Sequence, residues 1–263
     1  MPDCKKSSST RPLTRYLFAC CLITGLIALP IQIAAETAAS PVDSRKMYSS
    51  EAPAWLSAVG KLRVPGSTYR DGRRAHVLED CSATLVTGKA GRAADTIITA
   101  WHCLANYTDL SKPIVFTLVS GVPEVMRREA YRLTDGGGMH ADWAILRLRL
   151  PVAAGKANAL LVHPGRADPV RSITMAGYSR DATMGDYGNR LTFDAACVIT
   201  AEERGISDSN CTAYKGASGG AVVQVSGAGT PLLSGVISEG DSVGLSTFVP
   251  VAVFRGAINQ HLR

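Results

Sequence analysis

Residues 97–103 read IITAWHC, an apolar run that ends on His102 and a cysteine. Residues 216–220 read GASGG and place Ser218 among glycines. Between these two stretches, Asp142 opens the alternating run DWAILRL. A histidine, a carboxylate and a glycine-flanked serine are the components of a nucleophilic hydrolase. Their order along the chain also restricts the fold, because unrelated serine hydrolases carry the same three residues in different orders.

The chemistry explains why these residue types belong together. A serine hydroxyl is a weak nucleophile until a neighbouring base accepts its proton. Histidine serves as that base near neutral pH, and a buried carboxylate holds the imidazole in the required tautomer. Glycines let the backbone turn sharply and aim N–H groups at one point, as an oxyanion hole requires. The sequence therefore predicts His102, Asp142 and Ser218 as catalytic residues, with the backbone N–H groups of Gly216 and Ser218 as oxyanion donors.

Each of the three residues has a simpler interpretation when it is taken alone. A histidine is usually a packed or surface residue, and the chain has four others, at positions 76, 140, 163 and 261. Asp135 is an alternative carboxylate, although the three glycines that follow it indicate a loop. Ser218 alone would fit an ordinary glycine-rich turn. The joint occurrence of all three contexts in one chain favours catalysis. No metal or cofactor is expected.

The rest of the sequence predicts an all-β fold. Glycine and turn clusters recur at a spacing of roughly eight to twelve residues, which is typical of a β-sandwich or barrel. Short β-rich runs lie between them, at residues 96–99, 114–119, 143–148, 173–176, 221–225, 232–237 and 245–249. A helix is expected over the last stretch, residues 251–262, because Pro250 is a favourable helix start.

The loop-like run at residues 151–164, PVAAGKANALLVHP, divides this chain into two β-domains. We place the first at residues 55–155, where it contains the histidine and the aspartate, and the second at residues 156–263, where it contains the serine. A cleft between two such domains would let three distant residues converge.

Residues 1–35 have the composition of a secretory signal peptide. Four basic residues precede an uncharged apolar run, residues 16–35, that ends in small residues. An uncleaved anchor is the alternative, because about 20 apolar residues also span a bilayer; Pro30 and Gln32 favour cleavage. Residues 36–54 are small and polar, and we expect a flexible leader or a short pro-segment there. The protein is therefore expected to be secreted or periplasmic.

The cysteine count agrees with export. Of seven cysteines, three lie in the predicted signal peptide. The remaining four are an even set, which in an exported chain indicates disulfides. We expect sequential pairing, Cys81 with Cys103 and Cys197 with Cys211, and each short loop closed in this way would stabilise the fold by about 3 kcal/mol. A zinc site is the alternative, but the chain has no CxxC or CxxH spacing.

The charge pattern argues against nucleic acid as a partner. Half of the formal net charge of +6 belongs to the predicted signal peptide. The other basic residues form no cluster interleaved with aromatic side chains, which is the pattern of nucleic-acid interfaces. The expected partners are protein or peptide substrates, with membrane contact only through an uncleaved signal anchor. We expect a monomer.

The chain resembles the trypsin-like (chymotrypsin-fold) serine peptidases, in particular the bacterial secreted branch that includes glutamyl endopeptidases. The similar stretches are CSATLV (81–86), IITAWHC (97–103), DWAIL (142–146), AGYS (176–179), residues 211–220 and SGVIS (234–238). The resemblance extends from about Trp55 to Arg263. It implies two six-stranded antiparallel β-barrels with the active site in the cleft between them, a C-terminal helix, and endopeptidase activity through an acyl-enzyme.

The resemblance also assigns residues to substrate binding. Thr212 falls where trypsin-type enzymes carry the acid that binds lysine or arginine side chains, so that pocket design is not expected here. Ser238 and Gly240 would bind the substrate backbone as an added strand. Glu239 and Asp241 either attract a basic side chain or are solvated loop acids.

One departure from the family concerns activation. Ala217 stands where many members carry an aspartate that pairs with a new N-terminus made by zymogen cleavage. Residues 50–65 also contain no IVGG start. That activation switch is therefore expected to be absent.

Two other functions fit parts of the sequence. The GxSxG pattern at residues 216–220 also matches the nucleophile elbow of α/β-hydrolase esterases. That fold places its acid and histidine after the serine, and only His261 follows Ser218. The second alternative is a catalytically silent binding protein with the trypsin fold, which usually lacks one member of the triad.

Overall fold

The computed structural model describes residues 43–262. The predicted signal peptide, residues 1–35, lies outside the described residues, and so do residues 36–42 of the predicted leader. Within the described part of the chain, no helix is both long and apolar enough to cross a membrane.

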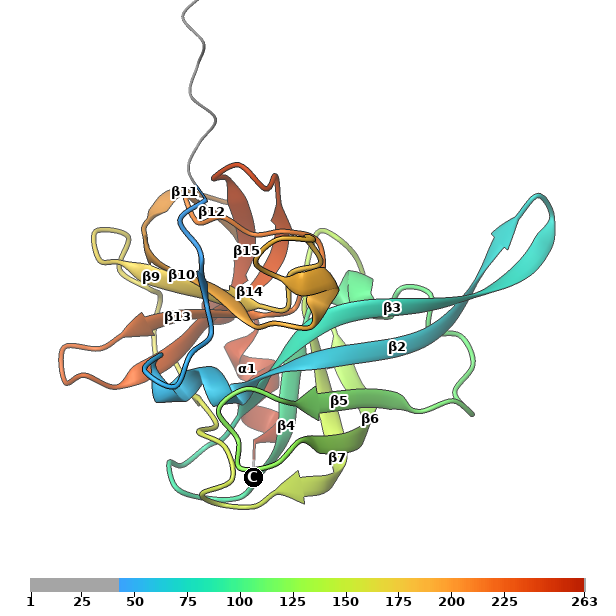
Figure 1. The fold of residues 1–263 in the computed structure, drawn as a ribbon, viewed down its shortest axis with the longest axis horizontal. Coiled ribbons are helices and arrows are strands. Elements are labelled where there is room, and N and C mark those ends of the chain that lie inside the picture. Colours follow the sequence, from blue (N-terminus) through green and yellow to red (C-terminus); the bar gives the residue numbers. More distant parts are fainter. Residues whose placement is uncertain (1–42, 263) are drawn as a thin grey trace, which may run out of the picture. The chain divides into compact units, whose positions relative to one another are not determined.

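The first half of the structure is a closed barrel of six strands, as expected (Figure 1). The strands are β2 (Val59–Arg70), β3 (Arg73–Val86), β4 (Ala94–Thr99), β5 (Ile114–Leu118), β6 (Met126–Asp135) and β7 (Ala144–Val152). They are paired in the order β2-β3-β4-β7-β6-β5, and the pairing of β2 with β5 closes the barrel. Leu62, Leu85, Ile97, Phe116 and Ile145 point inward and are almost completely buried. The alternation of apolar and polar residues thus fixes which face of each strand lines the core.

The second half is a nine-stranded sheet. Its strands are β1 (Lys46–Met47), β8 (Leu161–Val162), β9 (Ile173–Gly177), β10 (Thr192–Cys197), β11 (Ile199–Glu203), β12 (Ile206–Ser209), β13 (Ala221–Val225), β14 (Pro231–Gly240) and β15 (Ser246–Pro250). Hydrogen bonds join them in the order β1-β10-β9-β13-β14-β15-β12-β11, with β8 paired to β14. Only Val198 separates β10 from β11, although these strands lie near opposite ends of that order. The sheet must therefore curve round on itself.

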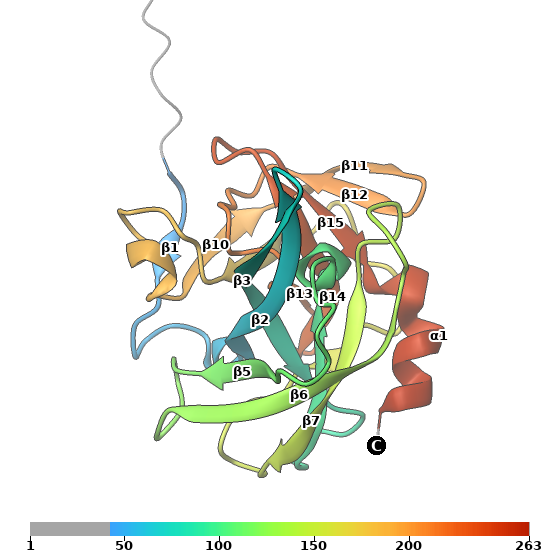
Figure 2. The same ribbon diagram turned by 90° about the vertical axis from the view of Figure 1, so that its right-hand side faces the viewer.

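The second sheet differs from the expected six-stranded barrel in two respects. It has nine strands, including the short β1 and β8, in place of six, and no hydrogen-bonded ladder among the described strands closes it. The all-β class and the C-terminal helix are confirmed. One α-helix, α1 (Val251–His261), is present in residues 43–262 and follows β15 (Figure 2). Alternating strands and helices, which an α/β-hydrolase needs, are not found in the described chain.

Helix α1 also contacts the first barrel. The ring of Phe254 stacks on Trp143, with ring centroids 4.8 Å apart. The guanidinium of Arg147 in β7 donates to the backbone carbonyl of His261 at 2.6 Å. These contacts link the end of the chain to the strand that follows Asp142.

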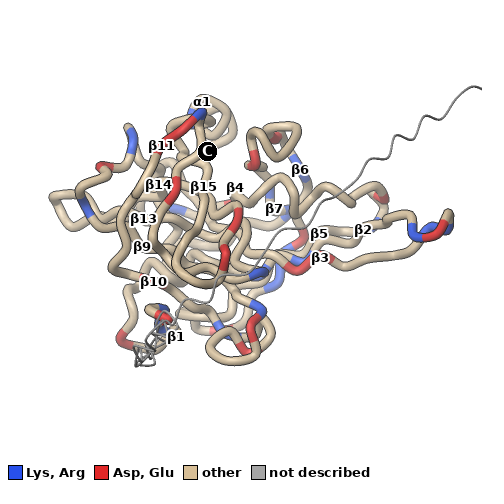
Figure 3. Tube along the Cα trace, turned by 90° about the horizontal axis from the view of Figure 1, so that it is seen from above, with Lys and Arg blue, Asp and Glu red and all other residues tan. Residues whose placement is uncertain are grey.

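The long hairpin of β2 and β3 was not among the strands expected from the alternation of the sequence. The two strands stay in register from Val59 opposite Thr84 to Arg70 opposite Arg73, and the outer part projects from the barrel (Figure 1). Asp71 and Gly72 both have positive φ angles, 50° and 73°, as a tight two-residue hairpin turn requires. Figure 3 shows basic and acidic residues side by side at the tip of this hairpin.

Residues 43–54 are the described part of the segment expected to be a flexible leader or a short pro-segment, and they make specific contacts with the rest of the structure. Strand β1 pairs with β10, and residues 54–58 form a short 3₁₀ helix whose Trp55 is buried. The Arg45 side chain is 1% exposed and forms ion pairs with Asp43 and Asp181. The polar composition of this segment therefore reflects specific contacts with the second sheet.

Candidate active site

His102 and Asp142 meet at the ends of two paired strands. His102 lies in the 3₁₀ helix η2 (Trp101–Leu104), which follows β4, and Asp142 comes just before β7. Thr99 in β4 is paired with Ala144 in β7, so the antiparallel ladder brings the two segments together. The Nδ1 atom of His102 lies 2.8 Å from Oδ2 of Asp142, and the backbone N–H of His102 donates to Oδ1 at 2.8 Å. Asp142 thus fixes both the backbone and the ring of His102.

Burial and hydrogen bonding set the protonation of this pair. Asp142 is 1% exposed, and burial alone would raise the pKa of its carboxyl group. The hydrogen bonds from His102 and Ser238 outweigh burial, so the pKa of Asp142 lies below its usual value. Burial lowers the pKa of His102, but the bond to Asp142 and the charges of Asp142, Glu79 and Glu239 more than offset it, and the pKa is raised. The arrangement therefore favours a carboxylate next to a histidine that is easily protonated.

Ser218 comes from the second sheet and opens onto the same cavity as His102. It lies in the loop between β12 and β13, and the cavity has a volume of about 530 Å³. The other lining residues are Met139, Ala213, Tyr214, Lys215, Ile237, Ser238, Glu239, Gly240 and Ser242. The structure therefore brings together the three residues singled out by the sequence: His102 and Ser218 line one cavity, and Asp142 lies behind His102.

Two glycines of the nucleophile loop, which we define as residues 214–220, are required by its shape. Gly216 has a φ of +96°, and a Cβ there would lie 2.6 Å from the carbonyl oxygen of Tyr178. Gly219 has a φ of +81°, and a Cβ there would overlap Thr99 and the carbonyl oxygen of Ser82. Both positions need the left-handed backbone that glycine adopts without strain, and neither has room for a side chain.

The orientation of two peptide groups in the nucleophile loop is fixed by their carbonyl oxygens. The carbonyl of Lys215 accepts a hydrogen bond from the Arg180 N–H at 2.7 Å, and that of Ala217 accepts one from the Gly220 N–H at 2.8 Å. In a trans peptide the C=O and the following N–H point in opposite directions. The N–H groups of Gly216 and Ser218 therefore point away from these partners, and they donate to no acceptor within residues 43–262.

Strand β3 supports the nucleophile loop at a residue that the sequence did not single out. The N–H of Ser82 donates to the carbonyl of Ser218, and its hydroxyl donates to the carbonyl of Gly216, both at 2.8 Å. The hydroxyl of Ser82 also accepts the N–H of Tyr178 at 2.8 Å. Ser82 follows Cys81, whose disulfide to Cys103 ties β3 to the 3₁₀ helix of His102. One short segment thus connects the base to the nucleophile loop.

The disulfides are those expected, Cys81–Cys103 and Cys197–Cys211. The sulfur atoms of Cys81 and Cys103 lie close to a ring nitrogen of His102, in an arrangement that could in principle hold a metal ion. Because these sulfurs are bonded to each other, neither is a thiolate, which is the form that binds metals.

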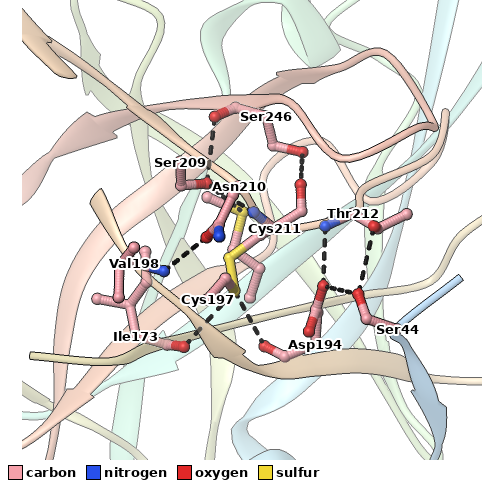
Figure 4. The surroundings of a disulfide bond; sticks show 11 residues. Ser44, Ile173, Asp194, Cys197, Val198, Ser209, Asn210, Cys211, Thr212 and Ser246 are labelled. Atoms are coloured by element: carbon pink, nitrogen blue, oxygen red, sulfur yellow. Dashed lines mark hydrogen bonds between the residues drawn. A yellow bond between two sulfur atoms is a disulfide. The ribbon is translucent and has the colours of Figure 1, made fainter. Parts of the chain in front are cut away.

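The second disulfide lies beside Thr212 (Figure 4). Thr212 is buried, and its N–H donates to the carboxylate of Asp194 at 2.9 Å. The same carboxylate accepts the hydroxyl of Ser44 at 2.6 Å, and that hydroxyl lies 3.4 Å from Oγ1 of Thr212. Thr212 does not line the cavity of His102 and Ser218, whereas its neighbour Ala213 does. The structure thus places it behind the cavity wall.

The residues at the end of β14 and just beyond it fall into distinct positions. Ser238, Glu239 and Gly240 line the cavity. The Ser238 hydroxyl donates to Oδ2 of Asp142 at 2.5 Å, a contact that no sequence pattern indicated. The carboxylate of Asp241 instead accepts the N–H groups of Val243 and Leu245, and Asp241 itself does not line the cavity, although Ser242 does. Of the two acids considered for a basic substrate side chain, only Glu239 is placed to meet one.

A closed six-stranded β-barrel and a second β-sheet, with His102 and Ser218 at one cavity and Asp142 behind His102, agree with the architecture of chymotrypsin-fold serine peptidases. The sequence model of the Trypsin family matches residues 66–258, which is most of the chain. The chain therefore belongs to the trypsin family of serine peptidases, whose members act on proteins or peptides. A comparison with curated protein sequences finds no match.

A solved structure shares the fold. The serine endoprotease from Yersinia pestis matches with a TM-score of 0.54 at 16% sequence identity. The match covers 79% of this chain and 63% of that one, so this chain spans less than two thirds of the length of its structural neighbour. At this level of identity the likeness concerns the arrangement of the strands.

Proposed function

We propose that this protein is an exported serine endopeptidase that uses His102, Asp142 and Ser218 as its catalytic triad. The observation that carries the proposal is the pair of hydrogen bonds from His102 to the buried Asp142, with Ser218 facing the same cavity as the imidazole. Asp142 holds Nδ1 of His102 as the proton donor, which leaves Nε2 free to accept the proton of the Ser218 hydroxyl.

The reaction proceeds through an acyl-enzyme. The Oγ atom of Ser218 attacks the scissile carbonyl while its proton moves to Nε2 of His102. The negative charge that develops on the carbonyl oxygen is met by the N–H groups of Gly216 and Ser218, which have no acceptor within residues 43–262. His102 then passes its proton to the leaving amine, and a water molecule activated by His102 hydrolyses the ester.

The end of β14 supports an extended substrate. Ser238 and Gly240 line the cavity beside His102, and backbone groups at such a strand end can pair with a peptide as an added strand. The hydroxyl of Ser238 is held by Asp142, so the backbone of Ser238 serves the substrate while its side chain serves the carboxylate. The resemblance places Thr212 where trypsin-type enzymes bind a lysine or arginine side chain. Here Thr212 does not line the cavity, and its neighbour Ala213 is the residue that faces a substrate there.

The experiment compares Ser218→Ala with the wild-type protein on a denatured protein substrate. Proteolysis is abolished in the variant, while its circular dichroism and thermal midpoint remain those of the wild type. Ser111→Ala, in an exposed loop of the first barrel, is the matched control and keeps full activity. Unchanged proteolysis in Ser218→Ala would refute the assignment.

Export is the second part of this proposal. Two disulfides in the described chain are typical of proteins that fold in an oxidising compartment. The N-terminal sequence of the mature protein, taken from a periplasmic or culture fraction, is expected to begin after residue 35. A cytoplasmic protein that retains Met1 and has four free thiols in its folded part would contradict this.

A further inference from the structure

Arg45 is a buried charge in the segment that precedes the first barrel. Its side chain is 1% exposed. Nε and Nη2 donate to the two oxygens of Asp43 at 2.9 and 2.7 Å, and Nη1 donates to Oδ1 of Asp181 at 2.8 Å. The plane of the guanidinium lies over the ring of Tyr214, 3.9 Å from its centroid. A guanidinium this deeply buried requires such a complete set of partners.

Two of these partners belong to the surroundings of the nucleophile loop. Tyr214 is the first residue of that loop, and it lines the cavity of His102 and Ser218. Its carbonyl accepts the N–H of Ala217 at 3.0 Å, so its position affects the turn that precedes the serine. The buried Arg45 packs over this ring through a cation–π contact.

The other partner, Asp181, is adjacent to the residue that orients the Gly216 N–H. The N–H of Arg180 donates to the carbonyl of Lys215, and in a trans peptide this bond turns the N–H of Gly216 away from Arg180. Asp181 also organises its own loop, because its Oδ2 accepts the hydroxyl of Thr183 and the N–H of Gly185. Arg45 therefore contacts the nucleophile loop and the segment that holds its peptide.

The residue that precedes Ser218 in the nucleophile loop carries no charge. Ala217, which precedes the serine, is 3% exposed. Arg45, Ala213 and Ala217 line one small pocket. The charged support of the loop thus comes from the N-terminal segment, which strand β1 and the Ser44–Asp194 hydrogen bond hold in place.

We propose that Arg45 is a positioning residue that holds the Lys215–Gly216 peptide in its anion-binding orientation, so that the N-terminal segment from Asp43 to Met47 is part of the working enzyme. This inference rests on the proposed peptidase function. It gives the described part of the leader a role in the folded enzyme, and N-terminal processing that removes Asp43 and Arg45 would therefore inactivate the enzyme.

The test is the steady-state kinetics of Arg45→Ala on a peptide ester, with Arg166→Ala as the matched control. Arg166 also forms an arginine–carboxylate pair in the second half of the chain, with Glu202, but is exposed. In Arg45→Ala, kcat falls by roughly 10- to 100-fold, less than the loss of a whole oxyanion donor, while KM changes little. Millimolar methylguanidine restores part of kcat in Arg45→Ala, and the same concentration of methylammonium does not. Arg166→Ala keeps the wild-type values.

A purely structural role would lower the thermal midpoint of Arg45→Ala and leave kcat intact in the fraction that remains folded; that result overturns the proposal. If Arg45→Ala does not fold, Asp181→Asn serves as the second variant. It keeps the size of the side chain and weakens one ion pair, and it is expected to lower kcat several-fold at unchanged KM. An unchanged kcat in folded Asp181→Asn overturns the proposal as well. Failure of the proposed function is distinct, because the wild type would then be no more active than Ser218→Ala.

Discussion

Replacement of Asp142 by asparagine tests the geometry of the candidate site most stringently. The carboxylate accepts three hydrogen bonds: the His102 N–H on Oδ1, and His102 Nδ1 and the Ser238 hydroxyl on Oδ2. An amide has one oxygen and one NH₂ group in place of two acceptors. If the oxygen keeps the backbone N–H of His102, the NH₂ group faces Nδ1, which must then lose its hydrogen. The proton moves to Nε2, where it blocks acceptance of the serine proton.

The opposite orientation of the asparagine is also unfavourable. Its NH₂ group would face the His102 backbone N–H at a separation of 2.8 Å, with two donors opposed in a buried site. The wrong tautomer is therefore the expected outcome, and its cost in a triad of this kind is about 10⁴-fold in kcat, or about 5.5 kcal/mol of transition-state stabilisation at 1.36 kcal/mol per tenfold.

The assay is the pre-steady-state hydrolysis of a chromogenic ester, in which the burst reports acylation of Ser218. In Asp142→Asn the burst rate falls by this factor, whereas KM stays close to the wild-type value because Asp142 does not line the cavity. A loss smaller than about tenfold in kcat, in a protein that keeps its wild-type fold, would refute the tautomer argument.

Three further predictions follow from the packing and the charges. The value of kcat/KM rises with pH as the imidazole of His102 loses its proton, and because the pKa of His102 is raised, the midpoint lies above the 6.5 of an unperturbed histidine. Gly219→Ala removes activity and destabilises the fold, measured by denaturant unfolding, by several kcal/mol, because a Cβ with a φ of +81° would overlap Thr99. Trp143→Ala removes the ring stacked on Phe254 and lowers the free energy of unfolding by about 2 kcal/mol or more.

Each of these predictions has a result that would contradict it, and Gly219→Ala also has a matched control. For the pH profile, a midpoint below 6.5 would mean that burial of His102 outweighs its carboxylate partner. For Gly219→Ala, the control is Gly137→Ala, which has a similar φ of +78° but open space around the position, so it isolates backbone strain from overlap. Equal effects of the two glycine variants would contradict the steric argument. An unchanged unfolding midpoint in Trp143→Ala would show that the stacked pair does not hold α1.

The sequence predicted several of the strands that bury one or both faces, but it did not predict β2, β6 or β10, which also bury residues. The runs that became β4, β7, β9 and β13 to β15 alternate or are continuously apolar, because one or both of their faces lie in the core. The outer part of the β2–β3 hairpin was missed because its side chains are largely polar and exposed, so burial leaves no pattern there. Its turn at Asp71-Gly72 is a local signal that could have revealed it.

Some residues of the candidate site could likewise be predicted from the sequence, and others could not. His102, Asp142 and Ser218 could be recognised because glycines and apolar runs constrain their immediate neighbours. Ser82 and the hydroxyl of Ser238 act through contacts between segments 96 or more positions apart in the sequence, and no local pattern records such contacts. Arg45 was hidden for the same reason: a polar N-terminal segment looks like a flexible leader until its partner, Asp181, is found 136 positions away.

The central claim, that Ser218 is a nucleophile activated by His102, is tested most directly by covalent labelling. The wild-type protein with its disulfides intact is treated with a fluorophosphonate and digested, and the adduct is located by mass spectrometry. A single adduct on Ser218, absent from His102→Ala, is the result expected. An adduct at another residue, or equal labelling of Ser218 in His102→Ala, would contradict the account.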